Sequence, residues 1–398
     1  MNKIQEGKFW LFFKGVLIFI VLLCFFVIFI PDQTYSRSAL LECREEVSAL
    51  QDYVTKLHSV GKANHKVKGP LRQKEAEKTQ RPKSVKDLDI HLESNEWLPE
   101  GYFGNNITAW PVNVVPDIVH YILYGTAAIT FSHMVSIFSV LRNHKPEVIY
   151  IHCDCQKIAN DANWMRIMNY VNETNTTFIQ VNTIQRPTEI YGIKIEKVVL
   201  NWHASNIMRY RILAEYGGIF LENDVYVCQP LDQFLKFEFT LNWDQHQFIG
   251  QQVLIANKNA RFLKFVLETY RLYQPAEWDY NSRELPTTAI LYKYPQLVHR
   301  VKEKFGANTA FVCSHFYRAY HPDWMDLFYI FHMVLRGNRI YWINLCDGRE
   351  DEPDDLDNIA EFDFNLESIK TLNTTFGEMA RWALYGVMER IHNNTALQ

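Results

Sequence analysis

The sequence predicts an α/β domain with a parallel sheet, preceded by a membrane-spanning helix and a stem. From about residue 112 onward, short apolar runs alternate with amphipathic stretches of helical spacing, which is typical of strands and helices in turn. Hydrophobic residues make up 48% of the 398 residues, enough for a full core. The expected domain covers 112–398.

A long apolar segment lies near the N-terminus. Residues 9–30, FWLFFKGVLIFIVLLCFFVIFI, are apolar apart from Lys14 and long enough to cross a hydrocarbon layer of ~30 Å. A cleaved signal peptide is the alternative, but its apolar region is shorter and no small-x-small cleavage site follows. Lysines on the N-terminal side favour a cytosolic tail at 1–8 and a signal-anchor of type II orientation, with all later residues luminal.

Residues 31–111 are expected to form the stem. Heptad spacing of apolar residues over 40–60 predicts a short coiled coil, which would make a homodimer through the stem, or else an isolated amphipathic helix. The basic stretch 62–86 is interpreted as a solvated linker rather than a polyanion-binding patch. A net charge of -4 argues against a nucleic-acid partner.

Other signals agree with a luminal, glycosylated body. Five Asn-x-Ser/Thr triplets lie beyond the anchor, starting at Asn106, Asn172, Asn175, Asn373 and Asn393. In an oxidising compartment we expect disulfides among the five cysteines of the body, with one thiol left over and the pairing open. These cysteines are Cys153, Cys155, Cys228, Cys313 and Cys346.

The elements of the domain follow in order along the chain. Strands are predicted within 117–125, 147–154, 177–183, 219–221 and 225–231, and helices within 130–146, 160–174 and 202–218. Gly217 and Gly218 can supply the left-handed cap that ends the third helix. Strands that alternate with helices imply right-handed crossovers, and ligands of such sheets bind at the carboxyl ends of the strands.

An acidic cluster stands at one of these carboxyl ends. Glu222 and Asp224 follow the strand at 219–221, where their carboxylates can converge on one hard cation such as Mn²⁺ or Mg²⁺. Such an ion on a diphosphate would neutralise the charge that builds up on a leaving group. The alternative is a polar turn between two strands.

The stretch ASNIMRYRILAEYGGIFLENDVYVCQPLDQF at 204–234 resembles the DxD sugar-binding region of the family 32 glycosyltransferases, the type that includes α1,4-galactosyltransferases and α1,4-N-acetylglucosaminyltransferases. The resemblance is strong at 205–233 and weaker over the rest of 114–340. It implies a GT-A fold (a Rossmann-like, nucleotide-diphospho-sugar transferase fold) in a single catalytic domain, and a type II Golgi membrane enzyme. It also implies a nucleotide-sugar donor, with a UDP-hexose favoured over GDP-mannose, and a glycan or glycolipid acceptor.

The resemblance assigns roles to individual residues. The positions that carry the nucleotide sugar are Ser205, Asn206, Arg209, Gly217, Gly218, Glu222 and Asp224. Asn206 and Arg209 lie three apart on one helix face, so both could reach the donor, although a salt bridge to a nearby carboxylate is the alternative for Arg209. Glu222 and Asp224 would hold the metal.

Two later residues are added to these candidates. His332 in FHMVLRG could be a third metal ligand or a structural histidine. Asp244 in LNWDQHQ could orient the acceptor hydroxyl as a catalytic residue, or lie in a solvated loop.

The sequence departs from the family pattern at two positions. Glu222 replaces the first Asp of DxD, and Asn206 replaces the Asp of S-D-x-x-R. Two hypotheses follow: a retaining, metal-dependent hexosyltransferase, or a catalytically silent homologue that binds a glycan or nucleotide sugar and regulates a partner.

Overall fold

The computed structural model describes residues 82–92, 109–306, 316–317, 319–333 and 364–388. The predicted anchor at 9–30 and coiled coil at 40–60 lie outside these ranges. Within them, no helix combines the length and the apolar character needed to cross a membrane. Residues 79–398 form one compact unit.

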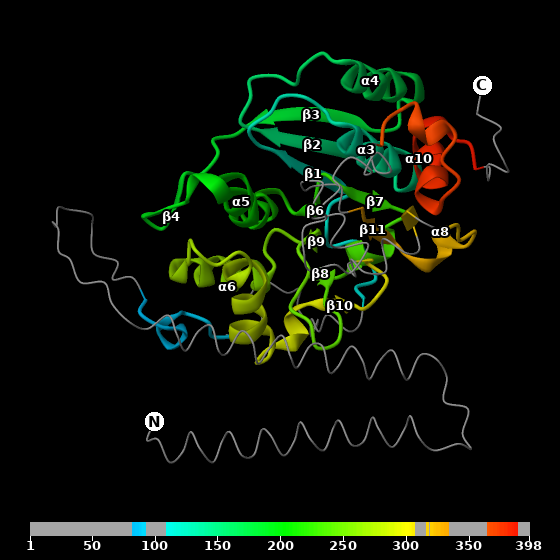
Figure 1. The fold of residues 1–398 in the computed structure, drawn as a ribbon. Coiled ribbons are helices and arrows are strands. Elements are labelled where there is room, and N and C mark those ends of the chain that lie inside the picture. The colour runs from blue at the N-terminus through cyan, green and yellow to red at the C-terminus, as the bar shows by residue number, and fades with distance from the viewer. Residues whose placement is uncertain (1–81, 93–108, 307–315, 318, 334–363, 389–398) are drawn as a thin grey trace, which may run out of the picture. The chain divides into compact units, whose positions relative to one another are not determined.

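The described residues form a seven-stranded sheet with two short two-stranded sheets (Figure 1). The large sheet has the order β10-β8-β9-β6-β1-β2-β3. Its strands are β1 (Ile118–Leu123), β2 (Val148–Cys153), β3 (Phe178–Thr183), β6 (Gly218–Leu221), β8 (Phe239–Asn242), β9 (Val253–Ala256) and β10 (His299–Val301). The short sheets pair β7 (Val225–Val227) with β11 (Ile330–His332), and β4 (Glu189–Ile190) with β5 (Ile193–Lys194).

The main helices among the described residues are α3 (Phe131–Asn143), α4 (Ala162–Thr174), α5 (Leu200–Tyr216), α6 (Arg261–Thr269), α8 (Trp324–Leu327) and α10 (Thr375–Tyr385). The predicted alternation from β1 to β6 is therefore confirmed. Side chains cap three of these helices as the sequence allows, because Thr130 accepts from His133 N, Asp161 from Trp164 N and Thr374 from Gly377 N.

The prediction of a parallel sheet is correct for only part of it. β3, β2, β1 and β6 run parallel, whereas β9 is antiparallel to both β6 and β8. The periodicity of a buried strand is the same in either direction, so this reversal could not be read from the pattern. β8 consequently runs in the direction of β6 and ends at the same edge of the sheet.

Alternating side chains of the strands divide the core between the two faces of the sheet. Val119 and Tyr121 belong to a cluster with α3, α4 and α10, whereas Ile122 and Phe220 belong to a cluster with α5 and α6. Figure 1 shows α5 and α6 together, apart from the group of α3, α4 and α10. The sheet is thus the middle layer of three.

Part of the segment assigned to the stem is packed onto this core. Leu88 and Ile90, which follow a short 3-10 turn at Val85–Asp87, are buried in the cluster that contains α5 and α6. Trp110 is also buried. The packed unit therefore begins earlier than the change of pattern at residue 112.

The cysteines of the described part behave in two ways. Cys153 and Cys155 form a disulfide with a Cα–Cα distance of 5.2 Å, and Cys228 is a buried free thiol. Cys313 and Cys346 lie outside the described ranges. A disulfide within the body was expected, but its pairing was not.

The glycosylation triplets are accessible where the structure describes them. Asn172, Asn175 and Asn373 are exposed, and Asn175 ends α4 in the left-handed conformation. Asn106 and Asn393 lie outside the described ranges. Their modification stays a prediction.

Candidate functional site

The Gly217–Gly218 pair directs the chain from α5 into β6. Gly217 caps α5 with φ +69° and ψ -168°, a combination essentially restricted to glycine rather than the left-handed helical cap that was expected. A Cβ on Gly218, whose φ is +105°, would lie 2.5 Å from Ile118 O. Both glycines are therefore required by the backbone, which supports their place in the motif.

Two histidines hold the same turn in place. Nε2 of His120 donates to Gly217 O at 2.8 Å, which leaves Nδ1 to accept from Nε2 of His152 at 3.0 Å. Burial lowers the pKa of His120 to about 4 and that of His152 to about 3, so both rings are neutral at pH 7. This chain of hydrogen bonds fastens the end of α5 to β1 and β2.

Three predicted metal ligands meet beyond the carboxyl end of β6. One ligand atom each from Glu222, Asp224 and His332 lies within 4.8 Å of the others. Nε2 of His332 is 3.3 Å from Oδ1 of Asp224 and 3.5 Å from Oε2 of Glu222. His332 arrives from a distant segment because β11 pairs with β7, which places it opposite Val225.

The backbone around this cluster is fixed on each side. Glu222 N donates to Gln252 O at 2.9 Å, and Met333 N donates to Asp224 O at 2.8 Å. Tyr317 donates its hydroxyl to Met333 O at 2.7 Å. Burial, together with the charge of Asp224, raises the pKa of Tyr317 well above its ordinary value, so this donor stays protonated.

The chemistry of this donor set fits a divalent cation. Asp224 is only 1% exposed, and a buried carboxylate needs a compensating positive charge. Two carboxylates and one imidazole suit Mn²⁺, and Mg²⁺ accepts the two oxygen ligands. The cluster, defined here as Glu222, Asp224 and His332, is called the acidic cluster below.

Arg209 connects α5 to the acidic cluster. Its Nη2 lies 3.0 Å from Oε1 of Glu222 and donates to Oδ1 of Asn206 at 2.9 Å and to Oγ of Ser205 at 3.4 Å. Nη1 donates to Gln251 O at 2.7 Å. The salt bridge considered as an alternative for Arg209 is therefore present, with Glu222 as the partner.

Asp244 lies at the same edge of the sheet as the acidic cluster, but it contacts other residues. Its Oδ1 accepts from Glu303 N at 2.7 Å, and Asn242 Nδ2 lies 3.4 Å from its Oδ2. β8 is two strands from β6, an offset of roughly 10 Å. The contacts hold Asp244 against the segment after β10, and its catalytic role stays a prediction.

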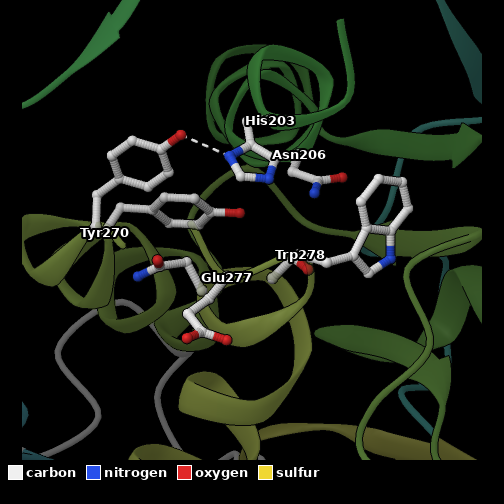
Figure 2. Close-up of a pocket in the computed structure, with 8 residues that line it drawn as sticks. His203, Asn206, Tyr270, Glu277 and Trp278 are labelled. Carbon is white, nitrogen blue, oxygen red and sulfur yellow. Dashed lines mark hydrogen bonds between the residues drawn. The ribbon is translucent and has the colours of Figure 1, made fainter. Parts of the chain in front are cut away.

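Sequence reasoning missed His203, which lies in α5 near the predicted Asn206. His203 and Asn206 face Tyr270 and Trp278 across a small cavity (Figure 2). His203 is three positions before Asn206 in the same helix, and this spacing was the available signal. The residues near 270–282 carried no recognisable motif.

A known protein family matches the segment that contains most of these residues. Residues 132–240 match the family described as glycosyltransferase sugar-binding region containing DXD motif. This segment is therefore similar to a glycosyltransferase sugar-binding region. This region includes Arg209, Glu222 and Asp224, and it ends before Asp244 and His332. The family 32-like resemblance noted from the sequence is thereby confirmed.

Similar proteins include a glucan organizing enzyme and several glycosyltransferases. Glucan organizing enzyme 1 of Cryptococcus neoformans var. grubii is 24% identical over 188 residues, which are 42% of this chain and 48% of that protein. The alignment thus spans about half of the relative. Among solved structures, PaToxG glycosyltransferase is 16% identical with a TM-score of 0.33, covering 47% of this chain and 72% of its own.

Two further structures are of the same kind. The glycosyltransferase GlyE of Streptococcus pneumoniae is 10% identical with a TM-score of 0.37, covering 56% of each chain. Galactosyltransferase LgtC, in complex with donor and acceptor sugar analogs, is 14% identical with a TM-score of 0.32, covering 60% of this chain and 98% of its own.

Proposed function

We propose that this chain is a glycosyltransferase with a GT-A-like fold that moves a hexose from a nucleotide sugar, with a UDP-hexose favoured, to a hydroxyl of a glycan or glycolipid. The observation that carries the proposal is the convergence of Glu222, Asp224 and His332 directly after β6, inside and beside the matched sugar-binding region. Retention of configuration, a Golgi membrane location with type II orientation, and manganese as the preferred ion belong to the same proposal.

The acidic cluster would bind the cation and, with it, the diphosphate of the donor. A divalent ion bound there would neutralise negative charge on the leaving diphosphate. Glu222 and Asp224 supply the anionic oxygens, and His332 supplies a nitrogen from the segment at 330–332. Arg209 holds one oxygen of Glu222 and thereby orients the carboxylate toward the cluster.

Polar and charged groups lie at the carboxyl edge of the sheet near this cluster. At the end of β2, Asp154 accepts from Gly125 N at 3.0 Å and pairs with Arg186 at 3.2 Å. Parallel strands whose ends carry polar and charged groups at one edge are the usual place for nucleotide ligands in open α/β sheets. The donor would therefore lie across the ends of β1, β2 and β6.

The two departures from the family pattern lie on either side of Arg209, which contacts both. Asn206 carries no charge. Of Asn206 and Glu222, therefore, only Glu222 forms an ion pair with Arg209. The longer arm of Glu222 lets one carboxylate meet both Arg209 and His332. The substitution at 206 is thus compensated by the substitution at 222.

A donor panel tests the proposal. The full chain should hydrolyse or transfer from at least one UDP-hexose in the presence of Mn²⁺, and EDTA should abolish this turnover. GDP-mannose serves as the comparison donor. If the folded protein binds nucleotide sugars but turns over none of them, with or without an acceptor, the regulatory homologue replaces the enzyme as the better description.

A further inference from the structure

A short turn lies between Asp244 and the strand that carries His332. It consists of residues 302–306, which follow β10 directly, and it is called the bridging turn below. The Phe305 side chain of this turn is fully buried, whereas residues 302–304 are exposed. The turn is therefore anchored in the core at its end and depends on polar contacts at its beginning.

The backbone of the bridging turn holds one edge of β11. Tyr329 N donates to Lys304 O at 2.9 Å, and His332 N donates to Gly306 O at 3.2 Å. The other edge of β11 pairs with β7, so the strand is held between two backbones. A Cβ on Gly306 would lie 2.8 Å from Ile330 O, which shows how closely the turn approaches the strand.

Asp244 holds the bridging turn at Glu303. The φ of Glu303 is +61°, a region that residues with a side chain rarely adopt. Oδ1 of Asp244 accepts from Glu303 N at 2.7 Å, and a charged acceptor makes this hydrogen bond a strong one. Asp244 is itself fixed, because Arg300 donates to Asp244 O at 2.8 Å and packs over the Trp243 ring at 4.4 Å. The carboxylate thus stabilises the uncommon backbone conformation at Glu303.

The bridging turn also contacts the segment that carries Glu222. Nε2 of Gln252, a residue that is 6% exposed, lies 3.4 Å from Phe305 O, and Gln252 O accepts from Glu222 N at 2.9 Å. Two members of the acidic cluster are therefore connected to one turn, His332 directly and Glu222 through Gln252. A shift of the turn would change the separation of these two ligands, on which the affinity of a metal site depends.

We propose that Asp244 is a positioning residue for the acidic cluster, which acts through the bridging turn to place His332 as the third cation ligand. This proposal rests on the proposed function and extends it to the construction of the cation site. Orientation of an acceptor hydroxyl, the role predicted from the sequence, requires the carboxylate itself. Positioning of His332 requires only an oxygen that accepts from Glu303 N.

Two substitutions of Asp244 distinguish these roles. Asp244→Ala removes the acceptor of Glu303 N, so the Kd for Mn²⁺, measured by calorimetry on the full chain without donor, should rise about tenfold. Asp244→Asn keeps an acceptor oxygen, and its Kd should stay within about threefold of the wild type. A residue that only orients the acceptor would instead leave Mn²⁺ affinity unchanged in both variants and lose activity in both.

A double variant tests whether Asp244 acts through His332. His332→Ala removes the ligand whose position is in question, so Asp244→Ala in that background should cause no further rise in Kd. Two losses that multiply in full would show that Asp244 acts on the protein in general, and would overturn the proposal.

Hydrogen exchange of the metal-free protein measures the position of β11 directly. In Asp244→Ala, peptides that cover 329–333 should exchange about fivefold faster at the amides of Tyr329 and His332, and peptides of β2 should be unchanged. Asp161→Ala is the matched control. It removes a carboxylate that accepts from a backbone amide at the start of α4, and it should change neither this exchange nor the Kd for Mn²⁺.

The outcomes are distinct. Equal Mn²⁺ affinity and equal exchange at 329–333 in Asp244→Ala and wild type overturn the proposal. A loss of affinity as large in Asp244→Asn as in Asp244→Ala also overturns it, because the charge and not the hydrogen bond would then be required. Failure of the proposed function appears separately, as a lack of donor turnover or of Mn²⁺ binding by the wild type, and the exchange at His332 still decides whether Asp244 positions it.

Discussion

Nη2 of Arg209 lies 3.0 Å from Oε1 of Glu222 and 2.9 Å from Oδ1 of Asn206. One guanidinium nitrogen therefore joins the two positions at which the chain departs from the family pattern. The second oxygen of Glu222 faces His332 at 3.5 Å. The reach of this side chain, and not only its charge, belongs to the site.

Shortening Glu222 should weaken the site. Glu222→Asp cannot keep both the contact with Arg209 and the position beside His332, so affinity for Mn²⁺ measured by calorimetry should fall about tenfold. In the double variant Asn206→Asp with Glu222→Asp, the new carboxylate at 206 can pair with Arg209, and affinity should recover. Equal or tighter binding by the single variant would show that the longer arm is not required.

Arg209 should not tolerate lysine. Lysine lacks the planar fork that reaches Gln251 O, Asn206 and Glu222 at once, so kcat/KM for the donor should fall roughly 100-fold. Arg211→Lys, at an exposed position of the same helix, is the matched control and should behave as wild type. Similar kinetics for both variants would remove Arg209 from the site.

Asp224 should link cation binding to stability. At a Mn²⁺ concentration 100 times the Kd, a bound ion would stabilise the fold by about 2.7 kcal/mol and raise Tm. Asp224→Asn keeps the shape and removes the charge, so its Tm should not respond to Mn²⁺. Asp232→Asn, at a carboxylate that is 67% exposed, should keep the wild-type response. A full response in Asp224→Asn would contradict the ligand assignment.

The paired histidines predict a loss of stability in mild acid. In the unfolded chain both titrate near pH 6.5, whereas burial holds the folded pKa values at about 4 for His120 and about 3 for His152. As pH falls below 6.5 the unfolded state binds more protons, so the free energy of unfolding decreases by up to about 1.4 kcal/mol per pH unit for each histidine.

Urea unfolding at pH 7, 6 and 5 measures this decrease. His152→Phe removes one of the two titrating groups, and its stability should therefore depend less steeply on pH than that of the wild type. A variant with the wild-type slope would assign the acid sensitivity to other groups.

Gly218 should be intolerant of any side chain. Alanine would bring Cβ within 2.5 Å of Ile118 O and 2.9 Å of Nε2 of His120 at a positive φ. We expect a loss of roughly 2–4 kcal/mol in the free energy of unfolding. Gly192→Ala is the control, because it shares a positive φ of +77° but meets no atom within 4 Å. Equal losses in the two variants would attribute the effect to φ alone.

Local sequence patterns predict much of the fold. The elements from β1 to β6 follow from apolar spacing and from the paired glycines, and their order placed Glu222 and Asp224 at a strand end. These patterns do not show which strand each later strand pairs with. β9 reverses direction and β11 pairs with β7 from about a hundred positions away, and such pairing depends on packing between distant segments.

The candidate site, like the fold, could be predicted from the sequence only in part. Glu222 and Asp224 are visible as neighbours in the chain, and His332 was available only through the family resemblance. The link from Asn206 through Arg209 to Glu222 requires the relative placement of α5 and β6. His203 and Trp278 have no shared motif, and only the burial of the first and the exposure of the second in the folded chain distinguish them.

The acidic cluster draws its members from both sides of the sheet. Arg209 of α5, in one core, holds Glu222, whereas Asp224 directly precedes β7 and His332 ends β11, and these two strands pack in the other core. The three ligands come together only when both cores are folded, so a cation would bind the folded protein in preference to the unfolded chain. The free energy of unfolding would then depend on the concentration of the divalent cation.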